Sequence, residues 1–217
     1  MIRFSLGLLA RAVTALVAAG VLAGCAPLVM GGVVVGGFVA TDRRTTGTQV
    51  EDQTIELKAA SRVSELATLG HVNIVSYNRT VLITGEVPNA DEKARVERAV
   101  AGVESVRTVI NELGIGGNST MGSRSNDTVL AGKISATLVD AADLQSNAFK
   151  IVVERGIVYL MGRVTEREAS RGTEIARSIK GVQKVVQVFE IITEAELAAL
   201  GQATAAPTPA PAASAPR

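Results

Sequence analysis

The feature that most constrains this chain is an internal repeat. Segments that begin at Asp52 and Asp127 carry apolar and turn residues in the same order, at an offset that grows from 75 to 79 residues. The matching pairs are Asp52–Ala59 with Asp127–Ile134, Val72–Ile74 with Phe149–Ile151, Val81–Val87 with Val158–Val164, and Gly102–Val106 with Gly181–Val185. Such a repeat predicts two copies of one small domain, with each two-residue drift in a loop or at a helix end.

The spacing of apolar residues predicts the same elements in each copy. Apolar residues four apart form one buried stripe on a first helix. The stripes are Ile55, Ala59 and Val63 in the first copy and Leu130, Ile134 and Leu138 in the second. Two strands follow, joined at Asn78-Arg79 and at Arg155-Gly156, and then a second helix and a last strand. We therefore expect an α+β fold of two tandem αββαβ domains, each a three-stranded mixed sheet with two helices on one face.

The second helix of each copy has a recognisable start. Asn89 precedes Glu92 by three residues, and Thr165 precedes Glu168 by the same interval, which is the spacing of an N-cap and its reciprocal partner. The residues expected on the buried side are Ala99 and Val103 in the first copy and Ile175, Ala176 and Ile179 in the second. Glycines at the ends of both helices suit their C-termini.

Composition sets the expected boundaries. The first domain covers 52–114 and the second covers 127–193, with a Gly- and Ser-rich linker at 115–126. Residues 194–217 are expected to begin with a short helical end and to continue as a tail rich in proline and alanine. Because such a tail buries too little apolar surface to fold, we expect it to be disordered.

The N-terminus has the pattern of an exported, lipid-anchored protein. Residues 1–24 combine a positive start, a short apolar run and small residues, as a signal peptide does. The ending Leu22-Ala23-Gly24-Cys25 resembles the bacterial lipobox, which implies cleavage before Cys25 and lipid attachment to its sulfur. Residues 25–51 are expected to form the lipidated N-terminus and a glycine-rich tether. The apolar stretch Ala26–Ala40 is short for a membrane span and holds four glycines, so a second membrane element is the less favoured alternative.

The residue types offer little to a catalytic or metal site. Cys25 is the only cysteine, which excludes internal disulfides, and His71 is the only histidine. We expect His71 to be a surface residue at a strand end rather than a ligand or a base. A formal net charge of +1 suits neither strong attraction to nucleic acid nor a basic groove. The expected protein is therefore not an enzyme, carries no cofactor or metal and binds no nucleic acid.

Two stretches carry a family resemblance. Val158–Val164 and Gly181–Val185, with looser copies at Val81–Val87 and Gly102–Val106, resemble the BON domain of bacterial envelope proteins. The lipobox, the tether, the segment Asp42–Gly47 and two such domains in this order resemble bacterial outer-membrane lipoproteins with two BON domains. That resemblance implies binding of anionic phospholipid and a role in outer-membrane integrity.

The resemblance places the lipid contact on the first helix of the second domain. Carried over to this chain, the contact residues are Val129 as an apolar wedge, Lys133 as a cation and Thr137 beside them. Relatives in this family have a bulky aromatic residue where this chain has Val129, so the resemblance implies a smaller wedge here. The alternative is that this helix only packs on its own sheet.

Location and partners follow from the same resemblance. Ala26 replaces the aspartate that commonly retains lipoproteins in the inner membrane, so we expect an outer-membrane protein that faces the periplasm. The expected partner is an anionic phospholipid surface, with envelope proteins as further candidates. The competing interpretation is an adaptor for envelope assembly or division machinery, in which lipid contact is incidental.

Overall fold

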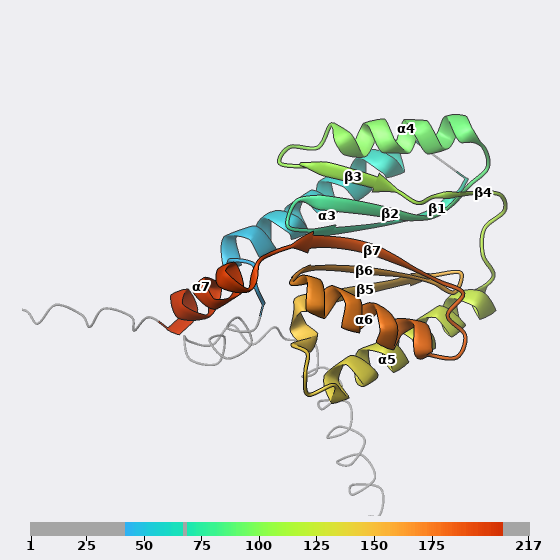
Figure 1. The fold of residues 1–217 in the computed structure, drawn as a ribbon. Coiled ribbons are helices and arrows are strands. Elements are labelled where there is room, and N and C mark those ends of the chain that lie inside the picture. The colour runs from blue at the N-terminus through green and yellow to red at the C-terminus, as the bar shows by residue number, and fades with distance from the viewer. Residues whose placement is uncertain (1–41, 67–68, 206–217) are drawn as a thin grey trace, which may run out of the picture. The chain divides into compact units, whose positions relative to one another are not determined.

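The structure is a computed structural model that describes residues 42–66 and 69–205 (Figure 1). The first copy contains α3 (Thr46–Glu65), β1 (His71–Tyr77), β2 (Thr80–Val87), α4 (Ala90–Ala101), β3 (Thr108–Asn111) and β4 (Gly114–Ile115). The second contains α5 (Met121–Asp140), η2 (Ser146–Ala148), β5 (Phe149–Glu154), β6 (Ile157–Val164), α6 (Glu166–Ser178), β7 (Lys184–Ile191) and α7 (Glu194–Ala205). The expected α+β fold of two αββαβ domains is confirmed.

Both sheets are mixed, as the repeat predicts. β2 pairs antiparallel with β1 and parallel with β3, while β6 pairs antiparallel with β5 and parallel with β7. The central strand of each sheet is therefore the second strand of its hairpin. One addition was not expected: β4 pairs in parallel with the end of β2, so the first sheet has four strands.

A buried aspartate ties the hairpin turn of each domain to its first helix. Both residues of each turn have positive φ, as the tightest hairpin turns require. These angles are 49° at Asn78, 66° at Arg79, 52° at Arg155 and 72° at Gly156. Asp52 accepts hydrogen bonds from both backbone N–H groups of the first turn at 2.8 Å. Asp127 accepts the equivalent bonds in the second turn at 2.8 and 2.9 Å, which explains why the two aspartates occupy the same place in the repeat.

Both first helices begin before their expected domain boundaries. Thr45 caps α3 by accepting a hydrogen bond from the N–H of Thr48, and Thr120 caps α5 through the N–H of Ser123. α3 therefore begins within the stretch 25–51 assigned to the tether, and α5 begins within the stretch 115–126 assigned to the linker. In both places a capping side chain satisfies a helix N-terminus that the hydrophobic spacing does not reach.

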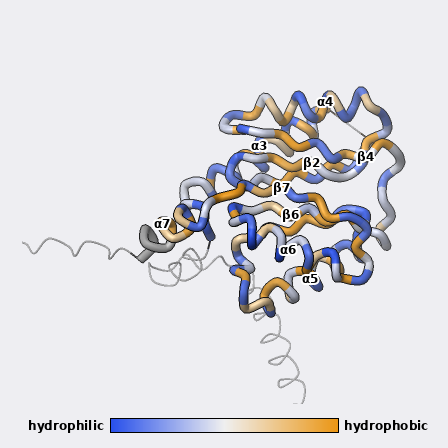
Figure 2. Tube along the Cα trace, in the orientation of Figure 1, coloured by the Kyte–Doolittle hydropathy of each residue, from blue (hydrophilic) through white to orange (hydrophobic). Residues whose placement is uncertain are grey.

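The helices of each domain cover one face of its own sheet. The predicted stripes on α3 and α5 are buried, and Ile175 and Ala176 of α6 are buried as expected. Figure 2 shows hydrophobic and hydrophilic residues alternating along α4. The prediction for α4 was wrong at Ala99, which is only half-buried, because Val96 and Val100 face the core together with Val103. Burying valine removes more apolar surface from water than burying alanine.

The other face of each sheet packs against the other domain. Every residue from Val81 to Val87 in β2 is buried, although successive strand residues point to opposite faces. A separate buried cluster accounts for the second face, since it draws its side chains from both sheets. Its members are Tyr77, Leu82, Val152, Tyr159, Met161 and Val188. Burial here raises the pKa of Tyr159 to about 12, as expected for a phenol between two sheets.

Several expectations fall on residues outside the described ones. The signal peptide, Cys25, most of the tether and the proline–alanine tail all lie there. α7 forms at the position expected for a short helical end. Within residues 42–66 and 69–205, no helix combines the length and the apolar character needed to cross a membrane.

The hydrogen bonds from the hairpin turns to Asp52 and Asp127 lead to a stability prediction. We expect Asp127→Ala to lower the free energy of unfolding by about 2–4 kcal/mol, because two buried backbone donors lose a charged acceptor. Urea unfolding monitored by circular dichroism measures the loss. Asp140→Ala, at the exposed end of the same helix, is the control and should stay within about 0.5 kcal/mol of the wild type. An equal effect of both substitutions would contradict a stabilising role of the hydrogen bonds to Asp127.

Candidate functional site

The helix α5 carries apolar residues on two faces. Its buried stripe packs on the second domain's own sheet. On the opposite side Val129 is 55% exposed and Val139 is 65% exposed. Gly132 and Ala136 are exposed between them, and the spacing of three and four residues places all four on one face. We call these four residues, Val129, Gly132, Ala136 and Val139, the α5 outer face.

The predicted contact residues lie differently with respect to this face. Val129 belongs to it, and Lys133 is exposed beside it. Lys133 forms no ion pair with any residue in the described part of the chain. Thr137 is half-buried and its hydroxyl donates to the carbonyl of Lys133 at 2.9 Å, so it turns back onto the helix. The structure thus brings Val129 and Lys133 together on the surface and places Thr137 at its edge.

Val139 and the small residues between the valines were not among the predicted contact residues. The signal was available, because Gly132, Ala136 and Val139 follow Val129 at intervals of three, four and three residues. Residues 128–139 contain one cation and no acid, and Asp140 ends the helix. This combination of exposed apolar side chains, small residues and an exposed lysine suits contact with an anionic interface.

The equivalent helix of the first domain has a different surface. The corresponding segment of α3, residues 53–64, contains Glu56 as well as two cations. Its lysine, Lys58, pairs with Glu104 at 3.0 Å, and the position equivalent to Val129 is Thr54. Leu57 is exposed on α3, but it lies one residue from that acid. The α5 outer face is therefore the better candidate for a lipid contact.

A buried ion pair fixes the start of the described chain to the second domain. The guanidinium of Arg43 donates to both carboxylate oxygens of Glu168, at 2.7 and 2.8 Å. The two side chains are only 5% and 4% exposed. The same guanidinium donates to the carbonyl of Arg163 at 2.8 Å, and Arg163 donates back to the carbonyl of Arg43 at 3.2 Å. We call the Arg43–Glu168 pair the tether clasp.

The next arginine holds the same segment to the first domain. Arg44 pairs with Asp42 at 2.7 Å and with Asp52 at 2.8 Å. Its guanidinium carbon lies 4.2 Å from the centre of the Tyr77 ring, a cation–π distance. Burial works to raise the pKa of Asp52, but hydrogen bonds from Arg79, Ser76 and Arg44 outweigh it and leave that pKa lowered. The two arginines thus connect residues 42–44 to both domains.

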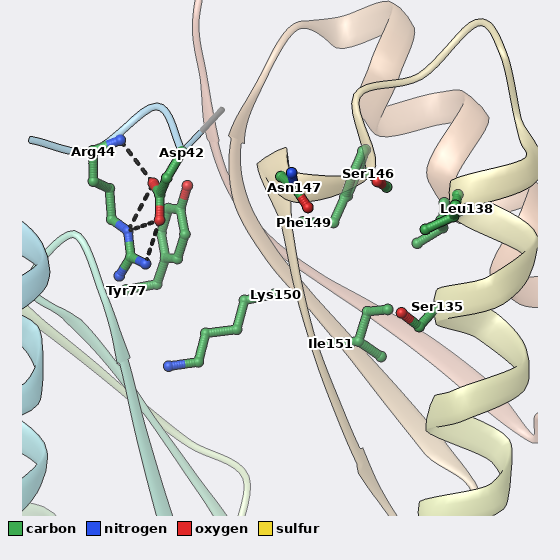
Figure 3. A pocket seen from close by; sticks show the side chains of 11 residues that line it. Asp42, Arg44, Tyr77, Ser135, Leu138, Ser146, Asn147, Phe149, Lys150 and Ile151 are labelled. Atoms are coloured by element: carbon green, nitrogen blue, oxygen red, sulfur yellow. Dashed lines mark hydrogen bonds and ion pairs between the residues drawn. The ribbon is translucent and has the colours of Figure 1, made fainter. Parts of the chain in front are cut away.

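A groove of about 380 Å³ lies beside this segment (Figure 3). Asp42, Arg44 and Tyr77 form one side, and Ser135 and Leu138 of α5 lie across from them. Val139 lines the same groove. The exposed end of α5 and the first described residues of the chain therefore share one surface.

His71 begins β1, as expected, and is half-buried. Burial lowers its pKa, the positive charge of Arg124 lowers it further, and Glu86 acts in the opposite direction. The imidazole is consequently neutral at neutral pH. Among the residues that the structure describes, no group of three or more His, Cys, Asp or Glu side chains is placed to hold a metal ion.

Comparison with known proteins decides the family. The model of the BON domain family matches residues 51–117 and 126–193. The chain belongs to the BON-domain family. It is 38% identical to the outer membrane lipoprotein DolP of Haemophilus influenzae over 174 residues, which cover 79% of this chain and 90% of that protein. This similarity makes it a DolP-like BON protein and supports a lipid-anchored location at the outer membrane.

Two other likenesses are more distant. The chain is 30% identical to a 21 kDa hemolysin of Actinobacillus pleuropneumoniae over 154 residues, which cover 70% of this chain and 79% of that protein. A solved structure of the C-terminal domain of CdsD, a structural protein of the type III secretion system of Chlamydia trachomatis, matches 63% of this chain and 96% of its own. Its identity is 10% and its TM-score is 0.28.

The tether clasp gives a pH prediction. Burial works to raise the pKa of Glu168, but hydrogen bonds from Arg43 and the N–H of Thr165 outweigh it, so the pKa lies below its ordinary value of 4.5. A carboxylate with a lowered pKa stabilises the fold at neutral pH, and that contribution is lost as the pH falls below 4.5 toward the folded pKa.

Thermal unfolding of the wild type and Glu168→Gln across pH 3 to 7 measures this contribution. The substituted amide keeps the capping acceptor and removes the charge, so the variant should melt at a lower temperature at pH 7 and converge with the wild type as the pH falls. Glu104→Gln, in an exposed pair, is the control with parallel curves. A difference between wild type and Glu168→Gln that stayed constant from pH 7 to pH 3 would refute the prediction.

Proposed function

We propose that this protein binds anionic phospholipid through the α5 outer face of its second BON domain and thereby supports the integrity of the outer membrane. Attachment through lipid on Cys25 is part of the proposal. The observation that carries it is the exposure of Val129 and Val139 on one face, with the exposed Lys133 beside them and no acid within 128–139. These groups offer contact chemistry, so the proposed role is binding rather than catalysis.

The free energies that these groups can contribute indicate that the lipid contact is weak without an anchor. Transferring the exposed parts of the two valines from water contributes about 1 kcal/mol each. One lysine near an anionic surface adds about 1 kcal/mol. A total of about 3 kcal/mol corresponds to a dissociation constant in the millimolar range or weaker. Lipid on Cys25 would make the contact effectively intramolecular and raise the local concentration of headgroups.

The similarity to an outer membrane lipoprotein supports the compartment in which this contact would occur. In the competing role, an adaptor for envelope machinery, the same helix face would bind protein instead. The exposed lysine favours the lipid role, because a cation beside valines matches an anionic headgroup layer above an apolar one.

Flotation with vesicles tests the proposal on residues 42–217, which lack Cys25. At low salt we expect a fraction to float with vesicles rich in phosphatidylglycerol and none with phosphatidylcholine alone. Val129→Glu and Lys133→Glu should each reduce the floating fraction by about fivefold or more, since one charge near the surface contributes about 1 kcal/mol.

The matched control is Thr54→Glu, at the equivalent exposed position of α3. It should leave flotation unchanged, and circular dichroism should show all variants folded. Equal flotation of the wild type and both α5 variants would show that α5 is not the lipid contact. Absence of flotation of the wild type would contradict the lipid role and leave the adaptor role standing.

A further inference from the structure

The first strand of the first domain has an open edge. β1 pairs with β2 on one side, and no strand in the described part of the chain pairs with its other side. Because Tyr77 and Thr80 flank a two-residue turn, the backbone groups of Tyr77 point to β2 and those of alternate residues point away from it. The residues whose backbone groups point outward are therefore Val72, Ile74 and Ser76.

Contacts at Ser76 agree with this direction and close one end of the edge. The N–H of Ser76 donates to Oε1 of Glu56 at 2.7 Å, and its carbonyl accepts a hydrogen bond from Nζ of Lys150 at 3.2 Å. Glu56 and Lys150 also pair with each other at 2.9 Å. Beyond this ion pair, residues 71–74 present roughly 13 Å of strand edge for pairing.

A groove runs beside the open part of the edge. Its volume is about 460 Å³. It is lined by Gly70–Ile74 and by three residues of α3, Ala60, Val63 and Ser64. None of these residues is Lys, Arg, Asp or Glu, and burial lowers the pKa of His71, so that this side chain is also neutral at neutral pH. Leu69, directly before Gly70, is 82% exposed and adds apolar surface next to the groove.

The other sheet edges of the described chain are protected from pairing. β5 contains Lys150 and Glu154, and β7 contains Lys184 and Glu190. β3 has four residues and β4 has two. Charged side chains and short strands are devices by which proteins prevent unwanted pairing at sheet edges. β1 has seven residues, His71–Tyr77, and none of them is Lys, Arg, Asp or Glu, so this strand lacks both devices.

The corresponding groove of the second domain differs in charge. It lies between α5 and β5, and its lining includes Asp42, Arg44 and Lys150 (Figure 3). An uncharged segment placed there would remove water from charged groups without replacing the lost hydrogen bonds. The groove of the first domain is therefore the better match for an uncharged segment.

We propose that the groove between α3 and the outer edge of β1 binds an uncharged, extended segment of a partner protein, which adds to the first sheet as a further strand. Backbone hydrogen bonds to Val72 and Ile74 hold the segment, and its alternate side chains enter the groove. The neutral lining beside an unpaired strand edge specifies this kind of partner. The proposal does not depend on the lipid contact, because the residues that line this groove all belong to the first domain.

Nuclear magnetic resonance of isotope-labelled residues 42–217, titrated with a short capped peptide of alternating valine and threonine, tests the proposal. At millimolar peptide we expect the amide signals of Val72 and Ile74 to shift and their hydrogen exchange to slow, because both N–H groups become hydrogen-bonded. The same peptide with N-methylated amides on both of its edges should bind about tenfold more weakly, since it loses backbone hydrogen bonds.

A pair of matched variants tests the position of the groove. Ala60→Glu introduces a charge at an exposed position of α3 that lines the groove, and it should weaken binding of the unmodified peptide by about tenfold. Ser135→Glu is the control, because Ser135 is exposed and lines the corresponding groove of the second domain. It should leave the affinity unchanged, and circular dichroism should show both variants folded.

Several results would overturn the inference. These are unchanged amide signals of Val72 and Ile74, shifts confined to β5, equal binding of the N-methylated peptide, and equal weakening by Ala60→Glu and Ser135→Glu. Shifts of the two β1 signals with rising protein concentration and no peptide would assign the edge to a second copy of the chain, and would overturn it as well.

Discussion

Each of the two sheets has a second apolar face that its own helices do not cover, and the structure depends on how that face is buried. β2 is buried along almost its whole length, and the two sheets meet through one shared cluster that contains Tyr77 and Tyr159. A single copy of the repeat would leave this face in water, where it would lose the free energy of apolar burial. The fold therefore requires both copies of the repeat. The helices lie on the outside of the paired sheets, where the α5 outer face is exposed to solvent.

The N-terminal segment is also joined to both domains. Arg43 joins residues 42–44 to the second domain, and Arg44 joins them to the first. The attachment point is thus fixed on the body that carries α5, so anchor and helix act on a surface whose geometry is defined. In the proposed role, a weak apolar contact gains most from such an arrangement, because the anchor would supply the encounter and the helix would supply the preference for lipid.

Much of the fold and part of the candidate site could be predicted from the sequence. The features that could not be predicted depend on contacts between residues far apart in the chain. Spacing by four identified the buried stripes of α3 and α5, and capping residues located the starts of α4 and α6, because both depend on neighbours in sequence. Periodicity indicates which face is apolar without indicating what covers it, so the packing of one sheet on the other was not predicted. The Arg43–Glu168 pair joins residues 125 positions apart, and no local pattern connects them. Val139 was missed because the predicted buried stripe ends at Leu138, whereas α5 continues to Asp140.

The central claim is that the α5 outer face is the surface that meets anionic phospholipid. Nuclear magnetic resonance of isotope-labelled residues 42–217, titrated with nanodiscs of phosphatidylglycerol, tests it residue by residue. We expect the amide signals of Val129, Gly132, Ala136 and Val139 to lose intensity first, while those of α3 and α4 persist. Loss concentrated on α3 or α4, with the α5 signals unchanged, would contradict it.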